Sequence, residues 1–241
     1  MFHDFNQYNQ HIKWLAEWLS DPGNAEPCAR FPAGPPDPGS SPGVYAWHGD
    51  ASADALVDKA LGSLPAKPLY LGRTCTPLNT RIVRTHLRNT KASTFRQSLA
   101  AMLWDELSLR CAGPKEIDAA SEMRLTQWML EHLSVTIVPI ADKSNVARIE
   151  ADVRECLELP LNLNRQPATP GTKRLRVLRR RHLSISDDLI DEYDQLFKIR
   201  AAEKSDPGVV VPITRASGKG SRRSRARSRT FWTPADAEGG A

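Results

Sequence analysis

The stretch from Pro68 to His86, PLYLGRTCTPLNTRIVRTH, most constrains what this chain can fold into. It opens with a short apolar run that ends at Gly72, passes through the breakers Pro77 and Asn79, and becomes basic with helical spacing from Arg81. This order predicts a strand, a turn and a helix. A strand tyrosine, a glycine where the chain turns and a helix arginine would then face one pocket, which suits a phosphate ester.

The segments around this stretch indicate a mixed fold. The β-branched and aromatic run at 43–48 predicts a strand that neighbours a second strand at 67–71, with a helical insertion at 52–61 between them. A third strand is expected at 135–140, and further helices at 5–19, 78–88, 93–107, 119–133, 144–159 and 186–203. The pattern predicts an α/β (α+β) class with a small central mixed or antiparallel sheet flanked by helices, and with helical N- and C-terminal extensions.

Length and composition indicate a soluble, cytoplasmic protein. The 241 residues hold one sizeable domain with appendages, and 40% of them are apolar. No run reaches the roughly 20 apolar residues of a membrane helix, and the N-terminus lacks the pattern of a secretory signal. The four cysteines form no CxxC pair, so zinc and redox chemistry have no support; Cys75, near the expected pocket, is interpreted as a plain thiol.

Positive charge is concentrated in the C-terminal third. Residues 171–241 hold 16 Lys or Arg against 9 Asp or Glu, a net of +7, so the chain total of +5 leaves −2 for residues 1–170. Attraction to a polyanion would therefore come mainly from this third. The run 173–181 is also compatible with a solvated helix end or a linker. The run 215–229 is also compatible with a localisation or solubility tail.

Several residues have side chains suited to phosphodiester chemistry. Tyr45 and Tyr70 lie on adjacent expected strands, but a phenol with a pKa of about 10 is a poor base unless a cation stabilises its deprotonated form. Arg81 offers fixed charge and a fork of donors for phosphate oxygens. His86 can accept or relay a proton, and Glu150 can hold a Mg²⁺ ion that keeps most of its waters.

The order of these residues resembles the GIY-YIG nuclease family. Its two motifs are matched by GVY at 43–45 and YLG at 70–72, its helix arginine by Arg81, its metal-binding glutamate by Glu150 and its later asparagine by Asn162. The resemblance covers about residues 43–165, and it gives Gly43 and Gly72 the role of the motif glycines.

Two features depart from the family pattern. Residues 49–67 are inserted between the two motifs. The family has a His or Tyr four residues after the arginine, whereas His86 comes five after Arg81, roughly 140° away on an ideal helix. A helix start with tighter or bulged geometry would bring the two together.

The resemblance implies a Mg²⁺- or Mn²⁺-dependent endonuclease that cuts double-stranded DNA by a one-metal mechanism, with a restriction-like, defence or DNA-processing role. Tyr45 would take the proton from water, helped by Tyr70 or His86, and Asn162 would orient the carboxylate or the phosphate. A homodimer stays open, and a membrane partner is not expected. The basic residues expected to contact DNA are Arg73, Arg84, Arg88, Lys173, Arg174, Arg179, Arg180, Arg181, Arg222, Arg223 and Arg225.

The expected organisation is an N-terminal helix with a Pro/Gly-rich linker (1–42), the nuclease domain (43–165), a basic linker with a helical extension (166–205) and a disordered basic tail (206–241). Two other functions remain open. The chain could be a catalytically silent nucleic-acid-binding protein on the same fold, or a protein-interaction module that docks through helices 93–133.

Overall fold

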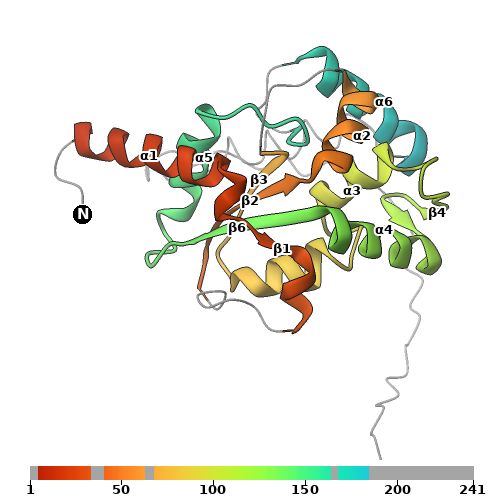
Figure 1. Ribbon diagram of the computed structural model, residues 1–241, viewed down its shortest axis with the longest axis horizontal. Helices are drawn as coiled ribbons and strands as arrows, with labels where there is room; N and C mark the ends of the chain where they lie inside the picture. The colour runs from red at the N-terminus through yellow and green to blue at the C-terminus, as the bar shows by residue number, and fades with distance from the viewer. Residues whose placement is uncertain (1–4, 34–40, 63–67, 164–167, 185–241) are drawn as a thin grey trace, which may run out of the picture. The chain divides into compact units, whose positions relative to one another are not determined.

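A four-stranded antiparallel sheet forms the centre of the protein (Figure 1). The structure is a computed structural model that describes residues 5–33, 41–62, 68–163 and 168–184. The strand order is β1-β6-β2-β3, and each neighbouring pair is antiparallel. The strands are β1 (Glu26–Pro27), β2 (Gly43–Gly49), β3 (Tyr70–Thr74) and β6 (Leu133–Pro139). The α+β class is thereby confirmed, and of the two expected arrangements the sheet takes the antiparallel one.

Strand β2 is buried along its whole length because the sheet is covered on both faces. Side chains alternate along it, as the pleat of a strand requires. Val44 and Ala46 join one apolar cluster, while Tyr45 and Trp47 join another. A tyrosine on this strand therefore points to a fixed face of the sheet.

The face of Val44 is covered by α1 (Phe5–Ser20) and α5 (Val146–Glu155), which lie side by side (Figure 1). Both helices are amphipathic: Leu15 and Leu19 of α1 are buried, as are Val146 and Val153 of α5. Helix α1 thus confirms the helix expected at 5–19.

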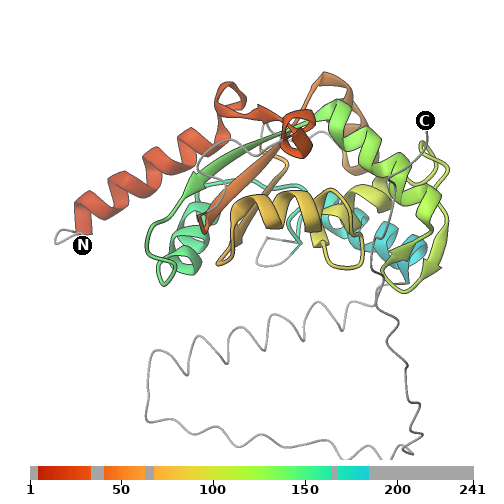
Figure 2. The ribbon, with the colours of Figure 1, turned by 90° about the horizontal axis from the view of Figure 1, so that it is seen from below.

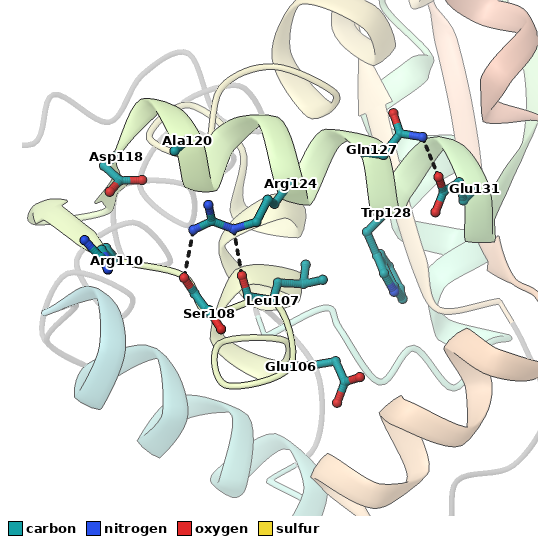
Figure 3. A pocket seen from close by; sticks show the side chains of 10 residues that line it. All are labelled: Glu106, Leu107, Ser108, Arg110, Asp118, Ala120, Arg124, Gln127, Trp128 and Glu131. Carbon is teal, nitrogen blue, oxygen red and sulfur yellow. Dashed lines mark hydrogen bonds between the residues drawn. The ribbon is translucent and has the colours of Figure 1, made fainter.

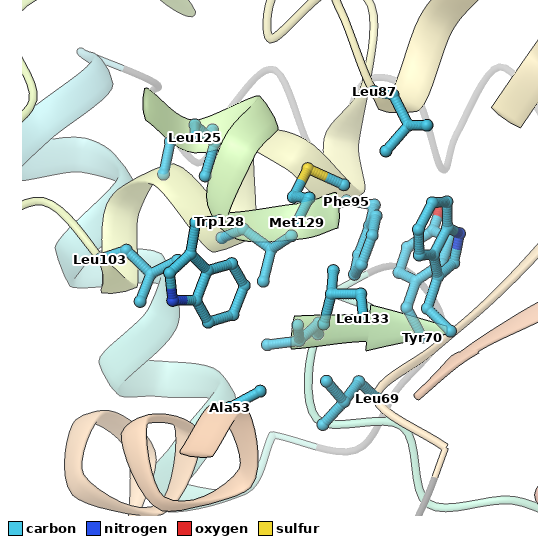
Figure 4. Packing of buried hydrophobic residues seen from close by; sticks show 14 of the residues in the cluster. Ala53, Leu69, Tyr70, Leu87, Phe95, Leu103, Leu125, Trp128, Met129 and Leu133 are labelled. Atoms are coloured by element: carbon cyan, nitrogen blue, oxygen red, sulfur yellow. The ribbon is translucent and has the colours of Figure 1, made fainter. Parts of the chain in front are cut away.

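The face of Tyr45 is covered by η3 (Thr80–His86), α3 (Thr94–Met102) and α4 (Ala119–His132). Figure 2 shows α1 and η3 (gold) on opposite sides of the strands. Helices α2 (Ala51–Leu61) and α6 (Pro170–Leu183) pack beside α3. Tyr70, Phe95, Trp128 and Met129 lie in the core of this face (Figure 4).

Local caps fix where these helices begin. Asp50, Ser93, Asp118 and Thr169 each precede a helix and accept a hydrogen bond from a backbone N–H in its first turn. Helix α5 begins at Val146, two residues later than the expected start at 144, and Asn145 is its N-cap residue. Helices α3 and α5 also end earlier than the expected residues 107 and 159.

Some elements were missed by the sequence patterns or placed differently. A hairpin of β4 (Cys111–Gly113) and β5 (Glu116–Ile117) forms around the break at Gly113-Pro114, and short helical turns η1 (Pro22–Asn24) and η2 (Cys28–Ala33) flank β1. The basic run at 173–181, for which a linker was one interpretation, lies in helix α6 with Leu175 and Leu183 in the core. The expected helix at 186–203 lies outside the described residues.

Strand β3 extends past Gly72 to Thr74, so the predicted turn at this glycine is wrong. Gly72 pairs with Tyr45 of β2. A Cβ atom at Gly72 would lie 2.5 Å from the Tyr45 ring, and one at Gly43 would lie 2.2 Å from the Val138 carbonyl oxygen. Both motif glycines are therefore required by close approach within the sheet.

Candidate active site

A cleft of about 430 Å³ lies along the outer strand β3. Its lining residues come from β2, β3, η3, α5 and the loop between β3 and η3. They are Tyr45, Tyr70, Gly72, Arg73, Thr74, Cys75, Thr76, Thr80, Arg81, Thr85, Glu150 and Arg154. Helices η3 and α5 cover opposite faces of the sheet. They reach one cleft because β3 is the edge strand, so Tyr45, Arg81 and Glu150 converge there as expected.

The Tyr45 hydroxyl lies between two nitrogen atoms. The distance from its oxygen to Nε2 of His86 is 2.7 Å, and Nε of Arg81 donates to the same oxygen at 3.4 Å. The ring is fully buried over Gly72, so its position is set by packing. One phenol thus contacts both the cation and the base predicted for it.

A π-helical turn brings Arg81 and His86 to the same tyrosine. Residues 80–86 form this turn, and the Leu87 N–H donates to the Ile82 carbonyl five residues earlier at 3.0 Å. In such a turn, residues five apart return to one side of the helix, whereas an α-helix would separate them. The bulged geometry therefore accounts for the extra residue between the arginine and the histidine.

His86 is held neutral by its surroundings. Burial of the ring, with help from the positive charges of Arg81 and Arg96, lowers its pKa well below the usual value. Its Nδ1 atom lies 2.6 Å from Oγ of Ser93, which also caps helix α3 by accepting from the Arg96 N–H. The imidazole is therefore hydrogen-bonded on both nitrogen atoms.

Arg96 holds the C-terminal end of the π turn in place. This fully buried guanidinium donates from Nη1 to the carbonyl oxygens of His86, at 3.3 Å, and Leu87, at 2.9 Å. Its Nε and Nη2 atoms pair with Oε2 of Glu122 on α4. The sequence patterns assigned no role to Arg96 or Glu122, since the two meet only through tertiary packing.

Tyr45 is protonated in this state of the cleft. Burial raises the pKa of its phenol above the usual value, and the neighbouring Tyr70 adds to this, while Arg81 and Arg73 oppose it. Tyr70 lines the cleft and shares a hydrogen bond of 3.3 Å with Oγ1 of Thr94. Of the two tyrosines, Tyr45 is therefore the one whose hydroxyl contacts His86 directly.

Glu150 is buried in the cleft wall and paired with two arginines. Its Oε2 atom lies 3.5 Å from Nε of Arg73, and its Oε1 atom pairs with Nη2 of Arg154 one helical turn later. Among the residues that the structure describes, no group of three or more His, Cys, Asp or Glu is arranged to hold a metal ion. A single carboxylate with water still fits Mg²⁺, which often binds through one or two carboxylates.

Asn162 does not reach the cleft. Its Oδ1 accepts from the Leu71 N–H at 2.9 Å and its Nδ2 donates to the Leu71 carbonyl at 2.8 Å. The amide therefore covers the open edge of β3 as a neighbouring strand would. Orientation of the carboxylate or the phosphate, which we expected of Asn162, is not what it does here.

A sequence-family model described as the GIY-YIG catalytic domain matches residues 43–181, more than half of the chain. The chain belongs to the GIY-YIG family. Comparison with curated proteins gave no match, and comparison with solved structures gave none either. Membership in this family supports a nuclease-type function that acts on DNA. No helix in the described part of the chain is both long and apolar enough to cross a membrane.

The other basic residues that were expected to contact DNA lie partly on the surface and partly in the core. Arg179 is buried and donates to the side-chain oxygen of Gln97, so its expected contact with DNA disagrees with its position. Arg222, Arg223 and Arg225 lie outside the described residues. The remaining exposed ones are Arg84, Arg88, Lys173, Arg174, Arg180 and Arg181.

A larger hollow of about 680 Å³ lies between α4 and the segment after α3 (Figure 3). Arg124 spans it and donates to the Leu107 and Ser108 carbonyl oxygens. None of the motif residues of the GIY-YIG family lines it. The motifs therefore identify the smaller cleft along β3 as the candidate active site.

Proposed function

We propose that the protein is a divalent-metal-dependent endonuclease that hydrolyses DNA phosphodiester bonds at the cleft along β3. The observation that carries this proposal is the Tyr45 hydroxyl held between His86 and Arg81 in the cleft that Glu150 also lines. Nucleophile activation and charge stabilisation need these groups at one phosphate.

In the proposed reaction, water attacks the phosphorus and the bond to the 3′ oxygen breaks. The leaving 3′ oxygen takes a proton from solvent, so the products are a 5′ phosphate and a 3′ hydroxyl. The Tyr45 oxygen takes the proton of the attacking water as its own proton passes to Nε2 of His86. This relay requires the ring proton of His86 to lie on Nδ1, where it is donated to Ser93. Arg81 stabilises the negative charge that gathers on the phosphate.

Glu150 would hold the Mg²⁺ or Mn²⁺ ion together with waters. When bound, the ion supplies positive charge that stabilises the leaving 3′ oxygen. Arg73, Arg154 and the threonine hydroxyls of the cleft then remain to contact the phosphates on either side.

A plasmid-nicking assay with and without Mg²⁺ tests this proposal. The wild-type protein should nick supercoiled DNA only with the metal, and Glu150→Gln should abolish nicking while leaving DNA binding, measured by fluorescence anisotropy, largely intact. Nicking by Glu150→Gln at the wild-type rate would refute the metal assignment. Metal-independent binding without any nicking would favour the silent DNA-binding protein instead.

We also propose that the basic C-terminal segment strengthens DNA binding through phosphate contacts. Deletion of residues 215–241 removes 7 Lys or Arg against 2 Asp or Glu. The affinity should fall and the slope of log K against log salt should flatten, because fewer counterions are released. Nicking should persist; an unchanged salt slope would exclude this role.

A further inference from the structure

The cleft carries an excess of positive charge before substrate binds. Three arginines and one carboxylate line it, namely Arg73, Arg81, Arg154 and Glu150, a net formal charge of +2. A divalent cation that enters alone meets this positive field. DNA phosphates, in contrast, are attracted to it.

The carboxylate that would hold the metal is already occupied. Arg73 pairs with one oxygen of Glu150 and Arg154 with the other. The Glu150 side chain is only 4% exposed, so water compensates little if either pairing is lost. A metal ion must therefore displace at least one guanidinium from this carboxylate.

Both arginines can turn to another anion. Their side chains are 25% and 15% exposed, and both line the cleft. A guanidinium binds phosphate as it binds carboxylate, through a fork of N–H donors. Phosphates in the cleft would compete with Glu150 for the same donors.

We infer that Arg73 and Arg154 restrain Glu150 until DNA phosphates take them over, so that DNA binding prepares the carboxylate for the metal ion. This inference rests on the proposed function, since it assumes that Glu150 is the metal ligand. Its consequence is that the metal and DNA bind with positive coupling, and each must raise the affinity of the other by the same factor.

The test measures Mn²⁺ binding to the full chain by isothermal titration calorimetry and by electron paramagnetic resonance of free Mn²⁺. All variants carry Tyr45→Phe, so that a mixed-sequence duplex oligonucleotide stays intact. The parent should bind Mn²⁺ weakly alone and at least about tenfold more tightly with the duplex, because the duplex supplies charge that opposes the arginines. Arg154→Gln and Arg73→Gln should each tighten Mn²⁺ binding without DNA and reduce the enhancement by DNA.

Arg148→Gln is the matched control. Arg148 lies on the same helix α5 and carries the same charge, but it pairs with Tyr8 and Asp152 and does not line the cleft. This variant should bind Mn²⁺ as the parent does. An equal gain in affinity with Arg148→Gln would show a general charge effect and overturn the inference.

Two further outcomes separate this inference from the proposed function. If Glu150→Gln abolishes Mn²⁺ binding while Arg73→Gln and Arg154→Gln bind as the parent does, the restraint is wrong and the metal assignment stands. If Glu150→Gln binds Mn²⁺ like the parent, the metal assignment fails and the inference fails with it.

Discussion

The two halves of the candidate active site differ in how their polar groups are satisfied. In the relay half, Tyr45, His86 and Ser93 are hydrogen-bonded in series and buried. In the carboxylate half, Glu150 is paired with Arg73 and Arg154, which can reach solvent. In the mechanism that we propose, the relay half is therefore organised for proton transfer before substrate arrives, whereas the carboxylate half must exchange partners first.

The two halves also differ in the contacts that hold their side chains in position. The relay half lies on the face of the sheet that carries the larger core and is fixed by Gly72 below Tyr45 and by Arg96 below His86. The carboxylate half lies at the edge strand and on α5, held by ion pairs. Substitutions in the relay half should thus act on the chemical step and on stability, and those in the carboxylate half on ligand binding.

Within the relay half, the largest effect is expected from Tyr45→Phe. Loss of the hydroxyl removes the proton acceptor, and kcat should fall by about 10²–10⁴-fold, the usual contribution of general acid–base catalysis. The ring still packs over Gly72, so the free energy of unfolding should fall by only about 1 kcal/mol. Single-turnover cleavage and urea denaturation measure the two quantities; a kcat close to wild type would show that the relay does not start at Tyr45.

Gly72→Ala should damage stability and catalysis together. The added Cβ atom would lie 2.5 Å from the Tyr45 ring, so the ring must shift away from His86. We expect a loss of about 1–3 kcal/mol in the free energy of unfolding, with lower kcat. Gly113→Ala is the control, because its nearest contact, Oε2 of Glu116, is 3.4 Å away. Equal losses in the two variants would mean that the Tyr45 contact is not the cause.

Arg96→Gln should move the acidic limb of the pH profile of kcat. The charged and titratable groups around His86 are Tyr45, Tyr70, Arg81 and Arg96, and removal of the Arg96 charge raises the His86 pKa. His86 must be neutral to accept a proton. As the pH is lowered, kcat of Arg96→Gln should therefore begin to fall at a pH up to about one unit higher than kcat of the wild type. Arg96→Lys keeps the charge, so it should lower kcat without moving the limb.

The same pKa shift affects stability. His86 has a lowered pKa in the folded protein, so the unfolded chain binds more protons as pH falls through about 6.5. The contribution of the neutral, buried His86 to the free energy of unfolding is therefore present above that pH and is lost below it. Arg96→Gln should weaken this acid sensitivity in thermal melts while lowering the melting temperature at neutral pH, because Glu122 loses its buried partner. A pH profile that does not move in Arg96→Gln would limit Arg96 to a purely structural role.

The sequence by itself determined the three main strands, most of the helices and the residue types of the site. Period-two alternation places Tyr45 on one face of β2, and helical spacing places Glu150 next to the core stripe of α5. These signals are local, so they predicted the three main strands and most helices, whereas the convergence of Tyr45, Arg81 and Glu150 was expected from the resemblance to the GIY-YIG family. The four-residue spacing of Glu150 and Arg154 was also a readable signal of their pairing.

Only the tertiary structure decided how the partners meet. The π turn joins Arg81 and His86 on Tyr45 because Arg96, from the next helix, binds the carbonyl oxygens at its end. Residue 72 within β3 must be a glycine because the Tyr45 ring of the neighbouring strand fills the space that a side chain would take. Asn162 binds β3 because that strand has an open edge. Each of these facts depends on contacts between distant segments, and such contacts leave no periodic pattern in the chain.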